Sequence, residues 1–289
     1  MRKIHICIFI QNMLTITIKN ATKVYQFTQI LQNLKNISSE LNLVCKEEGL
    51  YAQGMDSSHI CLFEMNITPE WFDGYSCTEP CIMGVHCEML FKIISCIKEG
   101  QHIDMKFDPN NSGDKLIIDL LGNSYDKSFE LTLVNIEEDM VELPEKEYTA
   151  DIRFVSKDFA ELVNQLSIFG DKLKISCGDD IVLNSENEFG KVDITVKEDD
   201  IIEYMMEEGA ETESEFGIKF IHMITKFSNL NKELSIHMSN DFPLKLCYNL
   251  DDWKEDGEDK EDENPEDEDE DESSPKNYMS FYLAPLLED

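Results

Sequence analysis

Basic residues are scarce in this chain. Its 289 residues include 25 Lys and Arg against 60 Asp and Glu, which gives a formal net charge of −35 at pH 7. A protein this acidic is not drawn to nucleic acid by its overall charge. Any contact with DNA must therefore come from a local exception to the average.

Several other patterns are missing. No apolar stretch approaches the roughly 20 residues that span a membrane. No glycine-rich loop of the P-loop or dinucleotide-binding type occurs, so the sequence offers no nucleotide site and predicts no cofactor. The nine cysteines are scattered rather than regularly spaced. This distribution argues against a secreted disulfide framework and favours a reducing compartment.

The N-terminus also lacks a recognisable targeting signal. Residues 1–12 ("MRKIHICIFIQN") hold a short apolar run with no small-residue cleavage site after it. We interpret them as an N-terminal extension, with Met13 as an alternative start of the chain.

What the sequence does contain is one unit that occurs four times. Apolar residues recur at helical spacing in residues 22–36, 87–98, 156–169 and 216–230, whose starts are 65, 69 and 60 residues apart. After each predicted helix come two alternating strands joined by turn residues, as in "KLKISCGDDIVLNS". Such recurrence favours two domains of two units each. The segment "NIEEDMVELPEKEY", with its proline and acid cluster, predicts a linker between them.

Two alternating strands stand near the ends of the two halves, at residues 128–134 and 191–198. An exposed strand edge is a template for pairing with another chain. If one edge pairs head-to-tail with the other edge of the next copy, a ring results when the rotation closes.

The four predicted helices are the exception to the acidity of the chain. Their net charges are +2, +1, −1 and +2, in a chain of −35. One interpretation is a set of sparsely charged, solvated faces. The other is a shared, mildly basic surface that contacts phosphates without reading bases. Contacts of so few lysines would be weak and salt-sensitive, which suits a protein that slides.

Two stretches resemble sites of chemistry. "GLYAQGMDSSHICLFEMNI" (49–67) holds Asp56, Ser57, Ser58 and His59 but lacks the context of a nucleophile elbow, so we predict no catalytic residue and expect a turn shaped by local backbone hydrogen bonds. "CTEPCIMGVHC" (77–87) lacks the spacing of a zinc finger, and His86 and Cys87 would point to opposite faces of a strand. We predict no metal site there.

Taken together, these segments resemble the proliferating cell nuclear antigen family, the sliding clamps of eukaryotes, archaea and some large DNA viruses. Besides 49–67, the resemblance rests on "CIMGVHCEMLFKIISC", "ELPEKEYTADIRF", "LSIFGDKLKISC", "SNDFPLKLCYNL" and "FYLAPLLED". Their order and spacing match from about Met13 to the last residue, apart from insertions.

The resemblance implies an α+β DNA-clamp fold with two similar domains, each with two helices packed on antiparallel sheets. The expected limits are 13–134 and 148–289, joined by a connecting loop at 135–147, with an acidic insertion at 254–275. Three copies would close into a pseudo-sixfold ring around duplex DNA.

The resemblance also implies a function. A clamp is a DNA polymerase processivity factor and not an enzyme; it tethers polymerase and other replication and repair proteins to DNA, without preference for sequence. A clamp loader opens the ring with ATP. The expected partners are double-stranded DNA, polymerase and other proteins with clamp-binding motifs, the loader and two further copies, with no membrane. The expected location is the nucleus, or the replication compartment of a virus.

The resemblance implies roles for three sets of residues, which stand at the positions where the family has residues with those roles. The DNA-facing set is Lys23, Lys35, Lys92, Lys98, Lys157, Lys219, His222 and Lys226. The partner-docking pocket is Met55, His59, Ile60, Leu62, Val141, Leu143, Pro144, Tyr148, Pro243, Tyr282, Ala284 and Pro285. The subunit interface is Phe129, Leu131, Leu133, Val192, Ile194 and Val196.

The chain departs from the family pattern in ways that leave an alternative open. It carries insertions at 199–215 and 254–275, and several inner-helix positions that are usually basic hold Thr28, Gln29 and Ser95. The acidic insertion is either a tolerated loop expansion or a segment that repels DNA or selects basic partners. The alternative function is a monomeric or dimeric acidic protein of the clamp fold that binds polymerase partners without encircling DNA.

Overall fold

A computed structural model describes residues 13–123, 125–137, 140–143, 147–206, 209–240, 242–251 and 275–286. Residues 1–12, Pro144 and most of the acidic insertion (252–274) lie outside the described residues. The predictions made for them therefore remain predictions.

Four α-helices occur in these described ranges, one in each predicted helical segment. They are α1 (Ala21–Leu34), α2 (Cys87–Ile94), α3 (Ser156–Leu166) and α4 (Ile218–Thr225), with 3₁₀ turns η1 (Pro69–Trp71) and η2 (Glu198–Asp200). Each ends earlier than its periodicity predicts, and Phe216 lies in the preceding strand. Lys35 and Lys226 are the C-caps of α1 and α4 rather than helical residues.

Three antiparallel sheets contain the described strands. The first, in its spatial order, is β5 (Gly74–Cys77), β1 (Leu14–Ile18), β7 (Gln101–Phe107), β8 (Lys115–Gly122) and β9 (Lys127–Thr132). The second is β13 (Gly190–Val196), β12 (Ile181–Asn187), β11 (Lys172–Cys177) and β15 (Thr212–Gly217). The central sheet is β14 (Glu203–Met206), β10 (Ala150–Val155), β16 (Glu233–Met238), β17 (Leu244–Asn249), β18 (Tyr278–Leu283), β4 (Cys61–Ile67), β3 (Gly49–Met55), β2 (Glu40–Lys46) and β6 (Cys81–His86).

The four predicted strand pairs are confirmed. Strand β2 pairs with β3, β7 with β8, β11 with β12 and β16 with β17, each antiparallel. The helix-plus-hairpin unit therefore occurs four times, in an α+β fold of antiparallel sheets and four described helices.

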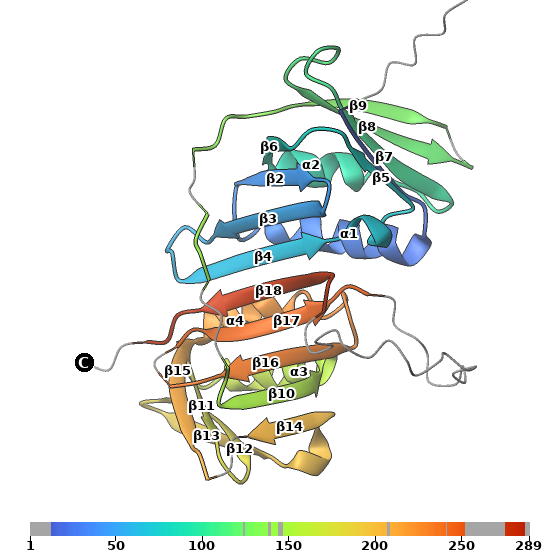
Figure 1. Ribbon diagram of the computed structural model, residues 1–289. Coiled ribbons are helices and arrows are strands. Elements are labelled where there is room, and N and C mark those ends of the chain that lie inside the picture. Colours follow the sequence, from blue (N-terminus) through green and yellow to red (C-terminus); the bar gives the residue numbers. More distant parts are fainter. Residues whose placement is uncertain are drawn as a thin grey trace, which may run out of the picture.

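The central sheet joins the two halves of the molecule. Strand β18, near the C-terminus, pairs along its whole length with β4, from Tyr278 opposite Asn66 to Leu283 opposite Cys61. The helices lie together on one face of this sheet, behind it in Figure 1. The segment that links the two halves crosses the opposite, outer face.

Apolar stripes of the helices close the core. In α1 the buried residues include Phe27, Leu31 and Leu34, at the spacing that predicted the helix. Two amides of α1 also bond the chain just after α4: Gln26 Nε2 donates to Leu230 O at 3.0 Å, and Asn33 Nδ2 to Lys226 O at 3.1 Å. These bonds tie the helical layer of one half to that of the other.

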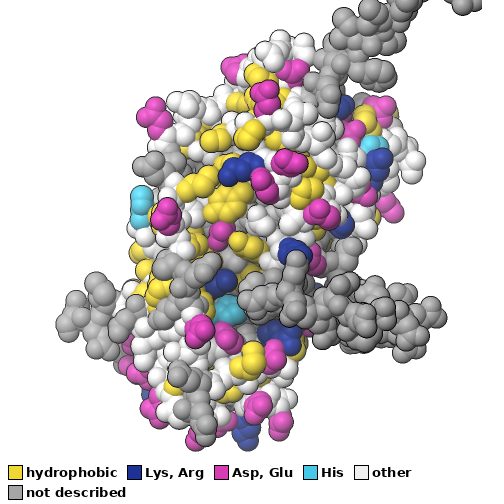
Figure 2. All heavy atoms as spheres, viewed as in Figure 1, with side chains coloured by type: hydrophobic (Ala, Val, Ile, Leu, Met, Phe, Trp, Pro, Cys, Tyr) yellow, Lys and Arg dark blue, Asp and Glu magenta, His cyan; other side chains and the backbone are white. Residues whose placement is uncertain are grey.

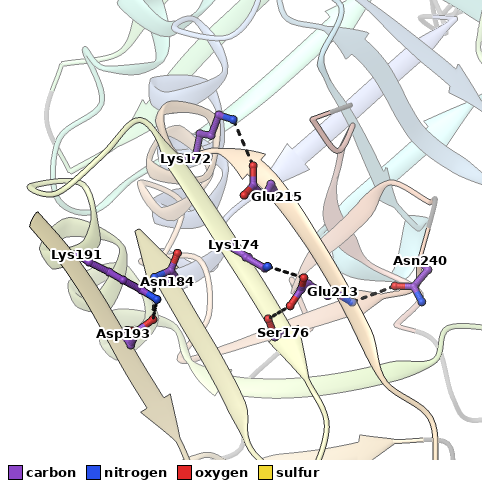
Figure 3. A network of polar contacts seen from close by, with 9 residues as sticks. All are labelled: Lys172, Lys174, Ser176, Asn184, Lys191, Asp193, Glu213, Glu215 and Asn240. Atoms are coloured by element: carbon purple, nitrogen blue, oxygen red, sulfur yellow. Dashed lines mark hydrogen bonds and ion pairs between the residues drawn. The ribbon is translucent and has the colours of Figure 1, made fainter. Parts of the chain in front are cut away.

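The four-stranded sheet carries polar pairs on its exposed face (Figure 3). Glu213 accepts from Ser176 at 2.7 Å and pairs with Lys174 at 2.5 Å, while Lys172 pairs with Glu215 at 3.4 Å. Cross-strand pairs of this kind each contribute modestly to sheet stability. They stand opposite the apolar face that packs on the core.

Candidate functional site

The turn between β3 and β4 is organised by one carboxylate. Asp56 Oδ1 accepts the backbone N–H of Ile60 at 2.8 Å and of Cys61 at 2.7 Å, and Oδ2 accepts that of Ser58 at 2.8 Å. Burial alone would raise the pKa of Asp56, but these N–H donors outweigh it and hold the pKa below its usual value. The expected turn with local hydrogen bonds is confirmed, and the acid that suggested catalysis is a structural residue.

His59 completes this turn in a left-handed conformation, with φ of +57°. Its side chain is exposed, as are those of Ser57 and Ser58. The turn therefore presents His59 at the outer rim of β3 and β4.

Three of the predicted docking residues form a row across neighbouring strands. Met55 of β3 is the register partner of Leu62 of β4, and Leu62 is the partner of Tyr282 of β18. Register partners project from the same face of a sheet. Leu62 is buried, whereas Met55 and Tyr282 are partly exposed. The row therefore forms an apolar floor with accessible ends.

The C-terminal segment runs beside the turn. Ala284 N donates to Ile60 O at 3.0 Å, which continues the β18–β4 pairing beyond the strands. Ala284 and Pro285 are partly exposed. The structure thus brings Ile60 and the C-terminal segment together, although more than 200 residues separate them in the sequence.

Two side chains of the central sheet bond the linker: Asn42 Nδ2 donates to Ile136 O at 3.2 Å, and Gln53 holds Val141. Gln53 Nε2 donates to Val141 O at 3.0 Å, and Val141 N donates to Gln53 Oε1 at 2.8 Å. Further back, the linker approaches β6 so closely that a Cβ on Gly84 would lie 2.1 Å from Val134 O. Val141 is exposed and Leu143 partly exposed. No helix or strand occurs in the described linker residues after Val134, as expected.

An aromatic group borders the other side of the floor. Tyr148 lies 5.4 Å from the ring of His237 and 5.8 Å from that of Phe242, the residue before Pro243. Burial, and then Glu64 and Tyr148, raise the pKa of Tyr282, which places Tyr148 within electrostatic range of the row. The predicted docking residues that the structure describes therefore lie along one side of the outer face.

Glu64 was not predicted from the sequence, yet it stands at the centre of this group. It accepts a hydrogen bond from Tyr278 at 3.1 Å and one from Tyr282 at 3.3 Å, and Lys245 lies 6.0 Å from the Tyr282 ring centre. The alternation in "YMSFY" places both tyrosines on one face. That pattern was the available signal, but it does not reveal which strand lies opposite.

Figure 2 shows hydrophobic side chains gathered over the central sheet on this outer face, with acidic side chains scattered around them.

The helical face holds the eight predicted DNA-facing residues. Five lysines are exposed, while Lys23, Lys35 and His222 are partly buried. Several of the ammonium groups lie over aromatic rings, at 4.6 to 5.6 Å from the ring centres: Lys23 over Trp71, Lys35 over Phe91, Lys98 over Tyr125 and Lys219 over Phe220. Such contacts hold the ammonium close to the protein surface.

One acidic residue reduces the basic character of this face further. Glu88 Oε1 lies 2.8 Å from Lys92 Nζ one turn later on α2, with both side chains exposed. The Lys92 ammonium lowers the pKa of Glu88, so the carboxylate is ionised at neutral pH. The helical face is therefore only weakly basic.

The predicted interface strands β9 and β13 are both edges among the described strands. Leu131 and Val196 are buried, whereas Phe129, Leu133, Val192 and Ile194 pack against the core with part of their surface exposed. Each edge therefore has an unfilled pairing side and a row of half-covered apolar side chains.

The cysteine-rich stretch divides into two groups. Cys81 is the register partner of Cys45 across β2 and β6, and Cys77 precedes it by four residues. Cys87 is buried at the start of α2, and His86 Nδ1 lies 3.1 Å from Glu40 Oε1. Among the described residues, no three His, Cys, Asp or Glu side chains are arranged to hold a metal ion.

No α-helix in the described ranges has the length and apolarity to cross a membrane.

The comparisons with known proteins cover most of the chain. Residues 13–142 match the family model of the N-terminal domain of proliferating cell nuclear antigen, and residues 142–255 match that of its C-terminal domain. "Proliferating cell nuclear antigen 2" of Plasmodium falciparum (isolate 3D7) is 28% identical over 272 residues, which is 91% of this chain and 96% of that protein. The protein of the same name from Drosophila melanogaster is 25% identical over 226 residues, 78% of this chain and 89% of that protein.

Proposed function

The chain belongs to the proliferating cell nuclear antigen family, and from this membership we propose that three copies close into a ring around duplex DNA and tether DNA polymerase to it. Proteins of this family act as sliding clamps and processivity factors in DNA replication and repair, and they are scaffolds rather than enzymes. We propose the same absence of catalysis here, with domains at 13–134 and 148–289 and a location at sites of DNA replication, in the nucleus or in a viral replication compartment.

The observation that carries the docking proposal is the convergence of three distant segments on the outer face. The row Met55, Leu62 and Tyr282 is flanked by the Ile60–Ala284 hydrogen bond on one side and by the linker at Val141 on the other. An apolar floor with aromatic borders suits the aliphatic and aromatic anchors of a partner peptide. The partly exposed residues Ala284 and Pro285 support strand addition by the partner backbone beside the C-terminal segment.

The ring proposal rests on the two edge strands. Strand β9 of one copy would pair with β13 of the next, which would satisfy both unfilled edges and cover Phe129 and Ile194. Because the two edges belong to opposite halves of the chain, the contact is head-to-tail and repeats until the rotation closes.

The third part of the proposal is a weak contact between the helices and DNA. The helices would line the hole and contact phosphates through lysines, without reading bases. The aromatic contacts of these lysines and the Glu88–Lys92 pair favour brief, salt-sensitive contacts.

The test is a primer-extension assay with a matched polymerase and loader on a singly primed circular template. The proposal expects long products that depend on the protein and on the loader with ATP. Short, distributive products under the same conditions would reject it.

A second function is favoured by the weak basicity of the helical face. The protein could bind polymerase partners as a monomer or dimer without encircling DNA. Light scattering separates the two: a trimer supports the ring, and a mass that stays monomeric over a wide concentration range supports the second function.

A further inference from the structure

Three thiols meet at the corner between the five-stranded sheet and the central sheet. Cys81 opens β6 and is the register partner of Cys45 in β2. Cys77 ends β5, and only residues 78–80 separate it from Cys81. Cys81 therefore has Cys45 opposite it in the sheet and Cys77 four residues before it in the chain. The docking, DNA-facing and interface surfaces use none of them.

The three sulfurs differ in access. Cys45 is fully buried, Cys81 is 8% exposed, and Cys77 is partly exposed. The Cys77 thiol donates to Glu79 O at 3.2 Å, within the turn that leads to Cys81. A small polar oxidant can therefore reach the pair from the side of Cys77, whereas Cys45 lies behind Cys81.

The neighbouring thiols also affect the ionisation of the Cys81 thiol. A hydrogen bond from the Cys45 thiol lowers the pKa of Cys81 against the opposing effect of burial, and the neighbouring Cys77 thiol lowers it further. The pKa of Cys45 is raised by its hydrogen bond to Cys81 and by burial, and that of Cys77 is raised chiefly by burial. Burial likewise raises the pKa of Cys61, Cys87, Cys177 and Cys247. The negative charge of the cluster therefore belongs on Cys81.

We propose that Cys81 is a site of thiol oxidation by hydrogen peroxide and that Cys77 is its resolving partner. The Cys81 thiolate attacks one peroxide oxygen, the O–O bond breaks, and the products are a Cys81 sulfenic acid and hydroxide, which takes a proton to become water. The sulfur loses two electrons and the peroxide gains them. The Cys77 thiol then loses its proton, its sulfur attacks the sulfenic sulfur, and a second water leaves as the disulfide forms.

The position of Cys77 decides the second step. It reaches solvent, so its proton can leave to water, and only residues 78–80 separate it from Cys81 along the chain. Cys45 has no such exit for its proton, because it is fully buried and donates to Cys81. The disulfide would join the last residue of β5 to the first residue of β6.

The experiment treats the full-length reduced protein with hydrogen peroxide at low molar excess and maps the products by alkylation and peptide mass spectrometry. Cys96 is the matched control, because it is exposed and lacks neighbouring thiols in the described structure. We expect a Cys77–Cys81 disulfide to form before Cys96 is oxidised. Replacing Cys81 by serine should slow the first oxidation on the order of tenfold, because the thiolate rather than the thiol is the nucleophile, and Cys96→Ser should not.

A second variant keeps the proposal testable. In Cys77→Ser the sulfenic acid has lost its resolving thiol, so dimedone should label Cys81. Thermal melts of each variant establish that it is folded. Oxidation of Cys96 before Cys81, or an unchanged rate in a folded Cys81→Ser variant, would overturn the proposal. A Cys45–Cys81 disulfide in the wild type would overturn the role of Cys77.

Discussion

The side-chain amide of Gln53 and the backbone of Val141 form a closed pair of hydrogen bonds, at 3.0 and 2.8 Å. This pair fixes the middle of the linker over the outer face of β3. Both bonds end on one linker residue, so a single substitution releases that residue without touching the core.

The first prediction concerns this attachment. Gln53→Ala should lower the affinity for a peptide with a clamp-binding motif by roughly three- to tenfold, since each lost hydrogen bond is worth about 1 kcal/mol and the linker must then be ordered on binding. Isothermal titration calorimetry measures the change. Gln32→Ala, on an exposed face of α1, is the control. Equal losses in the two variants would contradict the role of the linker.

The second prediction concerns the ring. Ile194→Glu places a charge among the half-covered side chains of the β13 edge and should convert the trimer to monomers, measured by light scattering. Met205→Glu is the control, because Met205 is 54% exposed on β14, another edge strand that the ring proposal leaves unpaired. Both variants must keep the far-UV spectrum of the wild type. A trimer that survives Ile194→Glu would reject the β9–β13 contact.

The third prediction concerns pH. The pKa of Asp56 is lower in the folded chain, so its stabilising effect is present above the unfolded value near 3.9 and is lost as the pH falls below it. Asp56→Asn should therefore reduce the free energy of unfolding by about 1–3 kcal/mol at neutral pH. Urea unfolding should show this difference shrinking at pH values below about 3. Asp171→Asn, at an exposed position, should show neither effect.

The fourth prediction concerns the helical face. Glu88→Gln removes the carboxylate that pairs with Lys92. The lysine then becomes available to a phosphate, so DNA affinity at low salt should rise and the slope of log K against log salt should steepen by about 0.9. The double variant Glu88→Gln/Lys92→Gln should lose that gain. An unchanged slope would mean that Lys92 does not face DNA.

The fifth prediction concerns the acidic insertion, which enters between β17 and β18. These strands pair up to Asn249 and Tyr278, so a short turn can replace residues 254–275 without disturbing the sheet. We expect the deletion to raise partner affinity or DNA affinity at low salt, because it removes 14 acids and two lysines. Titrations across salt concentrations measure this effect. Unchanged binding would leave the insertion as a tolerated loop.

Much of the fold could be predicted from the sequence because periodicity reports which face of an element is buried. The stripe of Phe27, Leu31 and Leu34 predicted α1, and the alternation in "KLKISC" predicted β11. Helix ends were predicted less well. Phe227 continues the apolar stripe of α4 and is fully buried, yet it lies after the last helical residue, Thr225. An apolar side chain can be buried by the loop that follows a helix as well as by the helix itself.

Periodicity does not report which strands pair with each other in a sheet. The features that the sequence did not predict all depend on such pairing. Glu64 meets Tyr282, 218 residues further along the chain, only because β4 pairs with β18. Cys45 lies opposite Cys81 only because β2 pairs with β6. The positions in the docking pocket came from the family resemblance, which carries such long-range information, and its roles for individual residues remain predictions.

The pairing of β4 with β18 has a consequence for how the chain is made. Strand β4 ends at Ile67, but its partner begins at Tyr278, close to the end of the 289-residue chain. On the ribosome, the first half can complete its helices and its five-stranded sheet while β4 still has a bare edge, since domains fold in the order of synthesis. That edge closes only after β18 has left the exit tunnel. A chain without residues 278–289 would therefore lose a strand from the middle of its largest sheet, and with it the β4–β18 pairing that joins its two halves.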